Sequence, residues 1–259
     1  MYFWKYWRDT RRGVYIYLGL LIFFAVVWAA SMYSWNRVAR IGGDPATLWM
    51  NELGVTFALS YLCALVMGFA TGSNNAGADI GKGTGDFLLT RPRSRRYFVW
   101  AGWVAGIVEL LGLIIFTSVF VFALSVWAIG PAWRQVSSAA HFEIGDKGQS
   151  AILDLPLMFA TVVLTGAVIY GLTYFMGVLL RGGQKGVIWS LAVMFGYSII
   201  SSLLRQFAGI RLPSLSLVDM ALHPVQHWYL EPRIQIAGWS MLALAFPFAA
   251  QAVLGRSDI

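Results

Sequence analysis

Charged residues are scarce in this sequence: Asp, Glu, Lys and Arg make up only 12% of its 259 residues. Soluble globular domains carry about 25%. Apolar residues fill the difference and reach 58% of the chain, with 12 Trp and 11 Tyr among them. So few charges cannot cover the surface of a soluble protein, and disordered chains are polar and poor in aromatic residues. The composition therefore predicts a multi-span membrane protein, in which Trp and Tyr collect at the two interfaces.

Cysteine is nearly absent as well, since Cys63 is the single one and lies in an apolar run. An intrachain disulfide and a cysteine-based zinc site are therefore excluded. The chain also lacks a Gly-x-Ser-x-Gly elbow and a His-Glu-x-x-His motif. Residues Gly77–Thr84 resemble a phosphate-binding loop, but Ala76 replaces its first glycine and Gly83 its Ser or Thr. No nucleotide, metal or other cofactor is expected in this chain.

Six apolar stretches are long enough to cross a bilayer as helices, which takes about 20 residues each. They are Val14–Trp35, Leu53–Gly72, Phe98–Ile129, Leu155–Leu180, Val187–Leu204 and Ile234–Leu254. None shows the strict alternation of a barrel strand, so the predicted fold class is all-α with six transmembrane helices. Residues 1–13 interleave aromatic and basic side chains and predict an N-terminal interfacial helix. Residues 1–259 thus form one membrane domain without a soluble domain.

The basic residues are unevenly divided between the two sides that this span assignment defines. The side with both termini and the second and fourth loops carries 12 Lys and Arg, and the other side carries 7. Because cytoplasmic loops are enriched in Lys and Arg, both termini are predicted to be cytoplasmic in a cell membrane of the bacterial inner-membrane type. The net charge of +7 is then a topology signal, and no nucleic-acid partner is expected.

Two features inside the spans predict contacts between helices. Glu109 lies near the middle of the third span, where an acid costs about 2.5–3.5 kcal/mol to insert, so it is expected to face protein, a cavity or a dimer interface. It is either a substrate- or gating-linked polar contact or a protonated or hydrogen-bonded structural residue. The pairs Gly68-x-x-x-Gly72 and Gly102-x-x-x-Gly106 let backbones approach closely, so spans two and three are expected to pack against other helices.

The second loop contains an amphipathic segment, Gly81–Arg96, with the sequence GKGTGDFLLTRPRSRR. Phe87, Leu88 and Leu89 form an apolar patch, Pro92 ends the helical pattern, and a dense basic run follows. A loop that only connected two spans would not expose three large apolar side chains to water. The segment is interpreted as a docking element, with adsorption to lipid headgroups as the alternative.

This segment resembles the membrane subunits of ABC-2 type transporters, which carry Gly-Thr-x-Glu, two or three apolar residues and Pro-x-Ser-Arg after the second span. The corresponding residues here are Gly83-Thr84-Gly85-Asp86-Phe87-Leu88-Leu89-Thr90-Arg91-Pro92-Arg93-Ser94-Arg95. Outside this stretch the likeness is one of layout: an interfacial helix, six spans, cytoplasmic termini and a long outer loop before the last span.

The resemblance implies that residues 78–96 are a cytoplasmic coupling helix that seats in a cleft of a separate ATP-binding cassette subunit. Its contact residues would be Asp86, Phe87, Leu88, Leu89, Arg91 and Arg95. It also implies that a second copy or a paralogue completes the pathway, that residues 205–233 form an outer re-entrant loop, and that the complex exports its substrate. ATP would be hydrolysed by the partner, so this chain itself is not expected to be an enzyme.

Two other functions stay open on the sequence. The first is a non-transporting complex in which the same module passes ATPase-driven motion to a sensing or periplasmic partner, although the outer loops are short. The second is a membrane-embedded enzyme that uses Glu109 and the outer histidines, although these groups lie at different depths. Asp219, His223 and His227 recur at helical spacing and could present a metal site, but Pro224 would break that helix.

Overall fold

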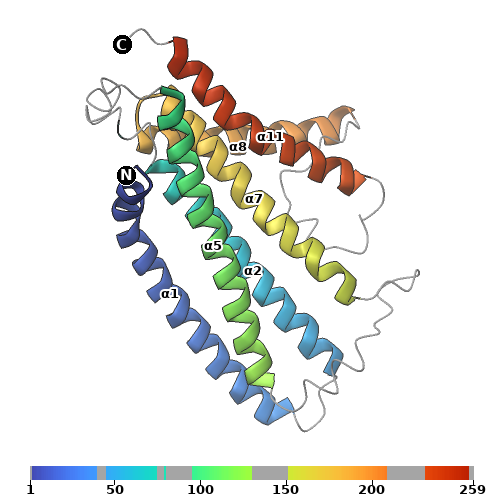
Figure 1. Ribbon diagram of the computed structural model, residues 1–259. Coiled ribbons are helices and arrows are strands. Elements are labelled where there is room, and N and C mark those ends of the chain that lie inside the picture. Colours follow the sequence, from blue (N-terminus) through green and yellow to red (C-terminus); the bar gives the residue numbers. More distant parts are fainter. Residues whose placement is uncertain are drawn as a thin grey trace.

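The computed structural model describes residues 2–39, 45–74, 79, 95–129, 151–208 and 231–256. Over these residues the chain is helical and contains no strand, as the all-α prediction requires (Figure 1). The long helices are α1 (Tyr2–Ala39), α2 (Pro45–Ser73), α5 (Arg95–Ile129), α7 (Ala151–Leu179), α8 (Gly183–Ala208) and α11 (Glu231–Arg256).

Five of these helices are long and apolar enough to cross a membrane, which is consistent with a multi-pass membrane protein. The stretches are Gly13–Ala30, Tyr97–Leu124, Phe159–Leu179, Gly183–Ala208 and Ala237–Leu254. The remaining predicted span lies in α2, where the apolar stretch that qualifies, Leu59–Ser73, is shorter. Residues 2–13, predicted as an interfacial helix, continue without a break into the first span as part of α1.

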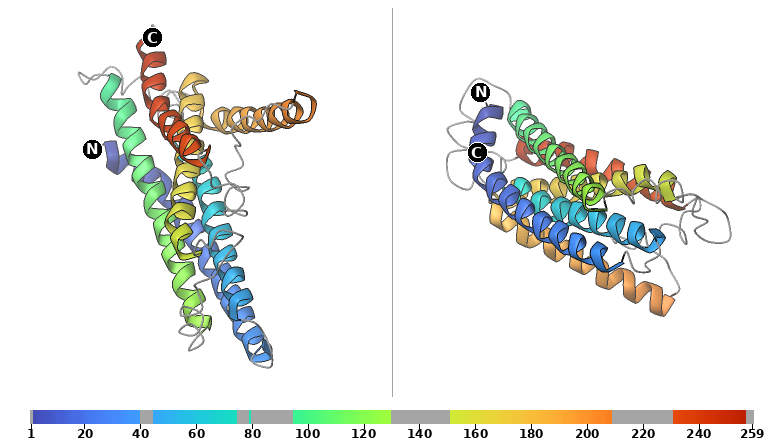
Figure 2. Two further views of the ribbon diagram at one scale, coloured as in Figure 1. Left: turned by 90° about the vertical axis from the view of Figure 1, so that its right-hand side faces the viewer. Right: turned by 90° about the horizontal axis from the view of Figure 1, so that it is seen from below.

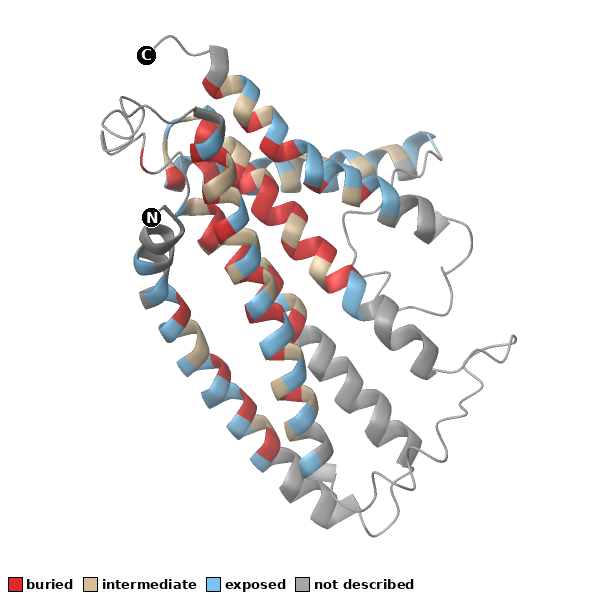
Figure 3. Ribbon diagram, in the orientation of Figure 1, coloured by how far each residue is buried: buried red, intermediate tan, exposed pale blue. Residues whose placement is uncertain are grey.

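Helix α7 is the centre of the bundle. It packs against α2, α11, α8 and α5, whereas α1 packs mainly against α5. Two thirds of its span residues (67%) are buried, against 22% for α1 and 28% for α5 (Figure 3). Lipid is as apolar as a leucine side chain, so close packing and interhelical hydrogen bonds, rather than exclusion of water, hold such helices together.

The contact between α2 and α7 depends on two glycines of α2. A Cβ atom added to Gly72 would lie 2.8 Å from Cβ of Thr173, and one added to Gly68 would lie 3.1 Å from Cγ2 of Ile169. Both distances are shorter than ordinary van der Waals contact. A side chain at Gly72 would force the two helices to shift, and one at Gly68 would require Ile169 to move by a few tenths of an ångström. The close packing that the small-residue spacing predicted for the second span is therefore present, and α7 is the partner.

A tight turn joins α7 to α8. The amide of Gly182 donates to the carbonyl of Gly177 at 3.0 Å and that of Arg181 to the carbonyl of Val178 at 3.4 Å, a Schellman pattern. Arg181 takes the left-handed position of this motif, with a φ of 50°. Figure 2 shows α8 inclined away from the other helices beyond this turn, and only 6% of its span is buried. Contact with α7 is made at its start, where Gly186 abuts the backbone of Gly177.

We predict that Gly72→Val weakens the bundle by about 1–3 kcal/mol, because the added atoms overlap Thr173 and the overpacked contact must open. The measurement is thermal unfolding of the purified protein in detergent. Gly19→Val is the matched control, since Gly19 of α1 is exposed and nothing lies within 4 Å of its added Cβ. Equal melting temperatures for the two variants would contradict the packing described for α2 and α7.

Candidate functional site

The loop that was predicted to dock on a partner, residues 78–96, lies mostly outside the described residues. This undescribed part holds five of the predicted contact residues: Asp86, Phe87, Leu88, Leu89 and Arg91. The sixth, Arg95, is the first residue of α5, so the last two residues of the predicted loop belong to that helix. The end of α2 and the start of α5 lie at the same end of the molecule as both chain termini (Figure 1).

Near the beginning of the predicted loop, Asp79 is described, and it is buried. It lies close enough to Tyr174 of α7 for the two side chains to interact electrostatically. A carboxyl group is rarely buried unless a polar group lies nearby, so the position of Asp79 beside Tyr174 indicates a specific contact with α7. The chain at Asp79 therefore lies close to the central helix α7.

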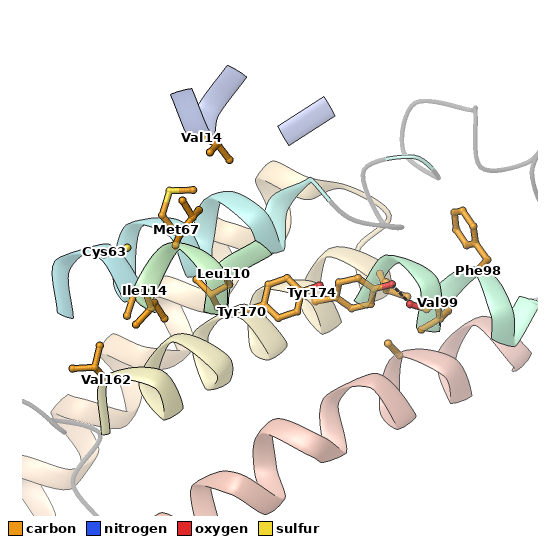
Figure 4. Close-up of a cluster of buried hydrophobic side chains, with 14 of the residues drawn as sticks. Val14, Cys63, Met67, Phe98, Val99, Leu110, Ile114, Val162, Tyr170 and Tyr174 are labelled. Carbon is orange, nitrogen blue, oxygen red and sulfur yellow. Dashed lines mark hydrogen bonds between the residues drawn. The ribbon is translucent and has the colours of Figure 1, made fainter. Parts of the chain in front are cut away.

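Two tyrosines of α7 tie α7 to the first half of α5. The hydroxyl of Tyr174 donates to the carbonyl of Val99 at 2.7 Å (Figure 4). The hydroxyl of Tyr170 donates to the carbonyl of Trp103 at 2.9 Å. Both rings are fully buried, and a side chain at Gly106 would collide with the Tyr170 ring. The segment of α5 that directly follows the loop is therefore fixed to α7 by hydrogen bonds as well as by packing.

The sequence reasoning missed these tyrosines, although a signal for them exists. Tyr170 and Tyr174 are four residues apart in a span, so they share one face of the helix. A tyrosine hydroxyl buried in a bilayer core needs an acceptor, and the carbonyls of a neighbouring helix are the acceptors at hand. The glycine pair of the third span, by contrast, was singled out, and Gly106 does lie against another helix, at Tyr170.

Glu109 lies on the wall of a groove between α1 and α5. Val14 and Leu18 contribute from α1, and one face of α5 from Ala105 to Phe116 forms the other side, around a volume of about 350 Å³. The Glu109 side chain is half-buried and its Oε1 atom is buried. Apart from this carboxyl group, every side chain that lines the groove is apolar.

A small polar cluster joins α1, α2 and α5 close to this groove. The hydroxyls of Tyr17 and Thr117 are hydrogen-bonded at 3.0 Å, and Thr117 Oγ1 lies 3.4 Å from the sulfur of Cys63. Cys63, the cysteine of the apolar run in the second predicted span, is fully buried. Since the three side chains come from three different helices, they fix α1 to the rest of the bundle at this level.

The other predicted polar candidates lie outside the described part of the chain. These are His223 and His227, which lie within residues 209–230 of the predicted re-entrant loop. The two ends of that predicted loop are helical: residues 205–208 belong to α8 and residues 231–233 to α11. Within the ranges that the structure describes, no three His, Cys, Asp or Glu side chains lie close enough together to hold a metal ion.

No family model, no curated protein and no solved structure matches this chain. Its function is therefore inferred from its own residues and their geometry.

We predict that Tyr174→Phe destabilises the protein by about 1 kcal/mol, within the range measured for hydrogen bonds between membrane helices. The change removes the bond to the Val99 carbonyl and keeps the buried ring. Thermal unfolding in detergent measures the loss. Tyr15→Phe on the exposed face of α1 is the control and is expected to behave as wild type. A Tyr174→Phe protein as stable as this control would show that the hydroxyl contributes nothing to the contact between α5 and α7.

Proposed function

We propose that this chain is the membrane-spanning subunit of an ABC transporter of the ABC-2 type, with six spans and cytoplasmic termini in a cell membrane. The observation that carries the proposal is the segment Gly83–Arg95, whose Gly-Thr pair, apolar triplet and Pro-x-Ser-Arg ending follow the pattern of that family. Its position supports the proposal, because it connects α2 and α5, the two helices that pack side by side and both contact α7.

The segment would bind a separate ATP-binding subunit through its apolar patch. Phe87, Leu88 and Leu89 would enter a cleft of the partner, since a few buried apolar anchors carry most of the energy of such interfaces. The charged residues at the rim, Asp86, Arg91 and Arg95, would set the orientation, because rim charges act mainly on steering and register. ATP would be bound and hydrolysed by the partner.

The contacts of α5 and α7 support a route for the motion produced by the partner. A push on the loop acts on the start of α5, and the hydroxyls of Tyr170 and Tyr174 connect that part of α5 to α7. Near the other end of the loop, the buried Asp79 interacts with Tyr174 of the same helix. Helix α7 in turn contacts α2, α8 and α11, so a shift of α7 would rearrange the whole subunit against its membrane partner, a second copy or a paralogue. Export between the two membrane subunits would follow from this rearrangement.

The docking interface can be tested by truncating its anchors. We predict that Phe87→Ala combined with Leu88→Ala weakens binding of the ATP-binding subunit about 30-fold or more, as expected for the loss of roughly 2 kcal/mol or more at a hot spot. The measurement is co-purification of the ATPase with the tagged chain, followed by ATP hydrolysis in reconstituted membranes. Ser94→Ala in the same loop is the control. Normal co-purification and normal coupled hydrolysis in the double variant would contradict the assignment of the coupling helix.

Orientation can be tested with an impermeant thiol reagent. Cys63 is fully buried, so the wild-type chain is expected to give no background and need not be altered. We predict that Ser94→Cys is labelled only after the membrane is opened, whereas Ser138→Cys reacts in intact cells, because the basic residues concentrate on the side of Ser94. Labelling of Ser94→Cys from outside intact cells would reverse the proposed topology.

A further inference from the structure

The groove between α1 and α5 combines a large apolar surface with one acid in the middle of a span. In the stretch Tyr97–Leu124, Glu109 is the sole Asp, Glu, Lys or Arg, and the facing stretch Gly13–Ala30 has none. Among the residues that line the groove, Glu109 is thus the one acidic side chain, and none is basic. An ionisable residue kept inside a membrane span is costly and is generally functional.

The side chains of α5 in this groove share one face of the helix. Ala105, Glu109, Gly112 and Phe116 follow one another at intervals of three or four residues, the spacing of a single helical face. Gly112 is placed one turn beyond Glu109, and nothing lies within 4 Å of a Cβ added there. The carboxyl group thus borders open space, and the volume of about 350 Å³ is within the range of about 300–1,000 Å³ typical of small-molecule pockets.

The depth of Glu109 decides which molecules could use its charge. It lies 14 residues after Arg95, the first residue of α5, which is about 21 Å along the helix axis. It is also near the centre of the apolar stretch Tyr97–Leu124. Phospholipid headgroups lie at the surfaces of a hydrocarbon core that is about 30 Å thick, and acyl chains carry no charge. A bilayer lipid could place a headgroup beside Glu109 only by drawing it away from the membrane surface, which favours a free hydrophobic molecule as the occupant.

We propose that the groove binds a hydrophobic molecule that carries a single positive charge. The apolar body would lie against Leu18, Leu113 and Phe116, and the cation would lie beside the carboxylate of Glu109. The low dielectric constant of the surroundings strengthens the attraction between the two charges and also raises the cost of removing each from water, so a weakly hydrated cation fits this place best. As a site for a transported substrate, this inference rests on the proposed function; as a binding site, it does not.

The experiment measures equilibrium binding to the full-length chain in lipid nanodiscs, without an ATPase, with empty nanodiscs subtracted. The probes are tetraphenylphosphonium, a hydrophobic monocation, and triphenylphosphine oxide, a neutral compound of similar shape. Glu109→Gln, which keeps the size of the side chain, is expected to weaken binding of the cation about tenfold or more and to leave the neutral probe unchanged. Glu109→Asp keeps the charge and is expected to retain much of the preference for the cation.

A second pair of variants tests the place of binding. Gly112→Leu fills the groove and is expected to weaken binding of both probes, the neutral one included. Gly196→Leu on α8 also projects into open space, but outside the groove, and is expected to bind both probes as wild type does. The proposal is overturned if the cation binds equally to wild type and Glu109→Gln, or if Gly112→Leu has no effect on either probe. Intact cation binding combined with failure of the ATPase experiment would contradict the proposed function and support the binding site.

Discussion

The contact of α2 with α7 is the constraint on which the bundle depends. Gly68 and Gly72 bring the two helices so close that Ile169 and Thr173 occupy the places where larger side chains would stand. Between helices in lipid no water is expelled, so stability has to come from this closeness and from hydrogen bonds. With α2 on one side, α7 receives α11 on another, where Phe246 lies against Gly171 and stacks on Phe175.

The position of α5 follows from the same central helix. The carbonyls of Val99 and Trp103 accept hydrogen bonds from the tyrosines of α7, which fixes one face of α5 inward. The face that carries Glu109 and Gly112 is consequently turned toward α1, and it forms the groove there. The groove thus depends on two contacts of α5. The hydrogen bonds to α7 orient α5, and the Tyr17–Thr117 hydrogen bond holds α1 beside it near this level.

In the proposed function, α5 connects the two functional regions. Its first residue, Arg95, ends the loop that would bind the ATP-binding subunit, and Glu109 stands four turns further along the same helix. A helix moves largely as a rigid body over such a length, so displacement at the loop would also change the groove. The buried Asp79 and the tyrosines of α7 would pass the same displacement to the centre of the bundle.

The sequence by itself determined the membrane class, the helical fold, most of the apolar stretches, the close approach at Gly68 and Gly72, and the presence of an acid in mid-span. It did not determine which helix those glycines face, where the hydroxyls of Tyr170 and Tyr174 find acceptors, or that Glu109 opens toward α1. In water, an apolar stripe marks the buried face of a helix. In lipid, the buried and the outer faces are both apolar, so the pattern along the chain carries little information about direction, and only the tertiary packing decides it.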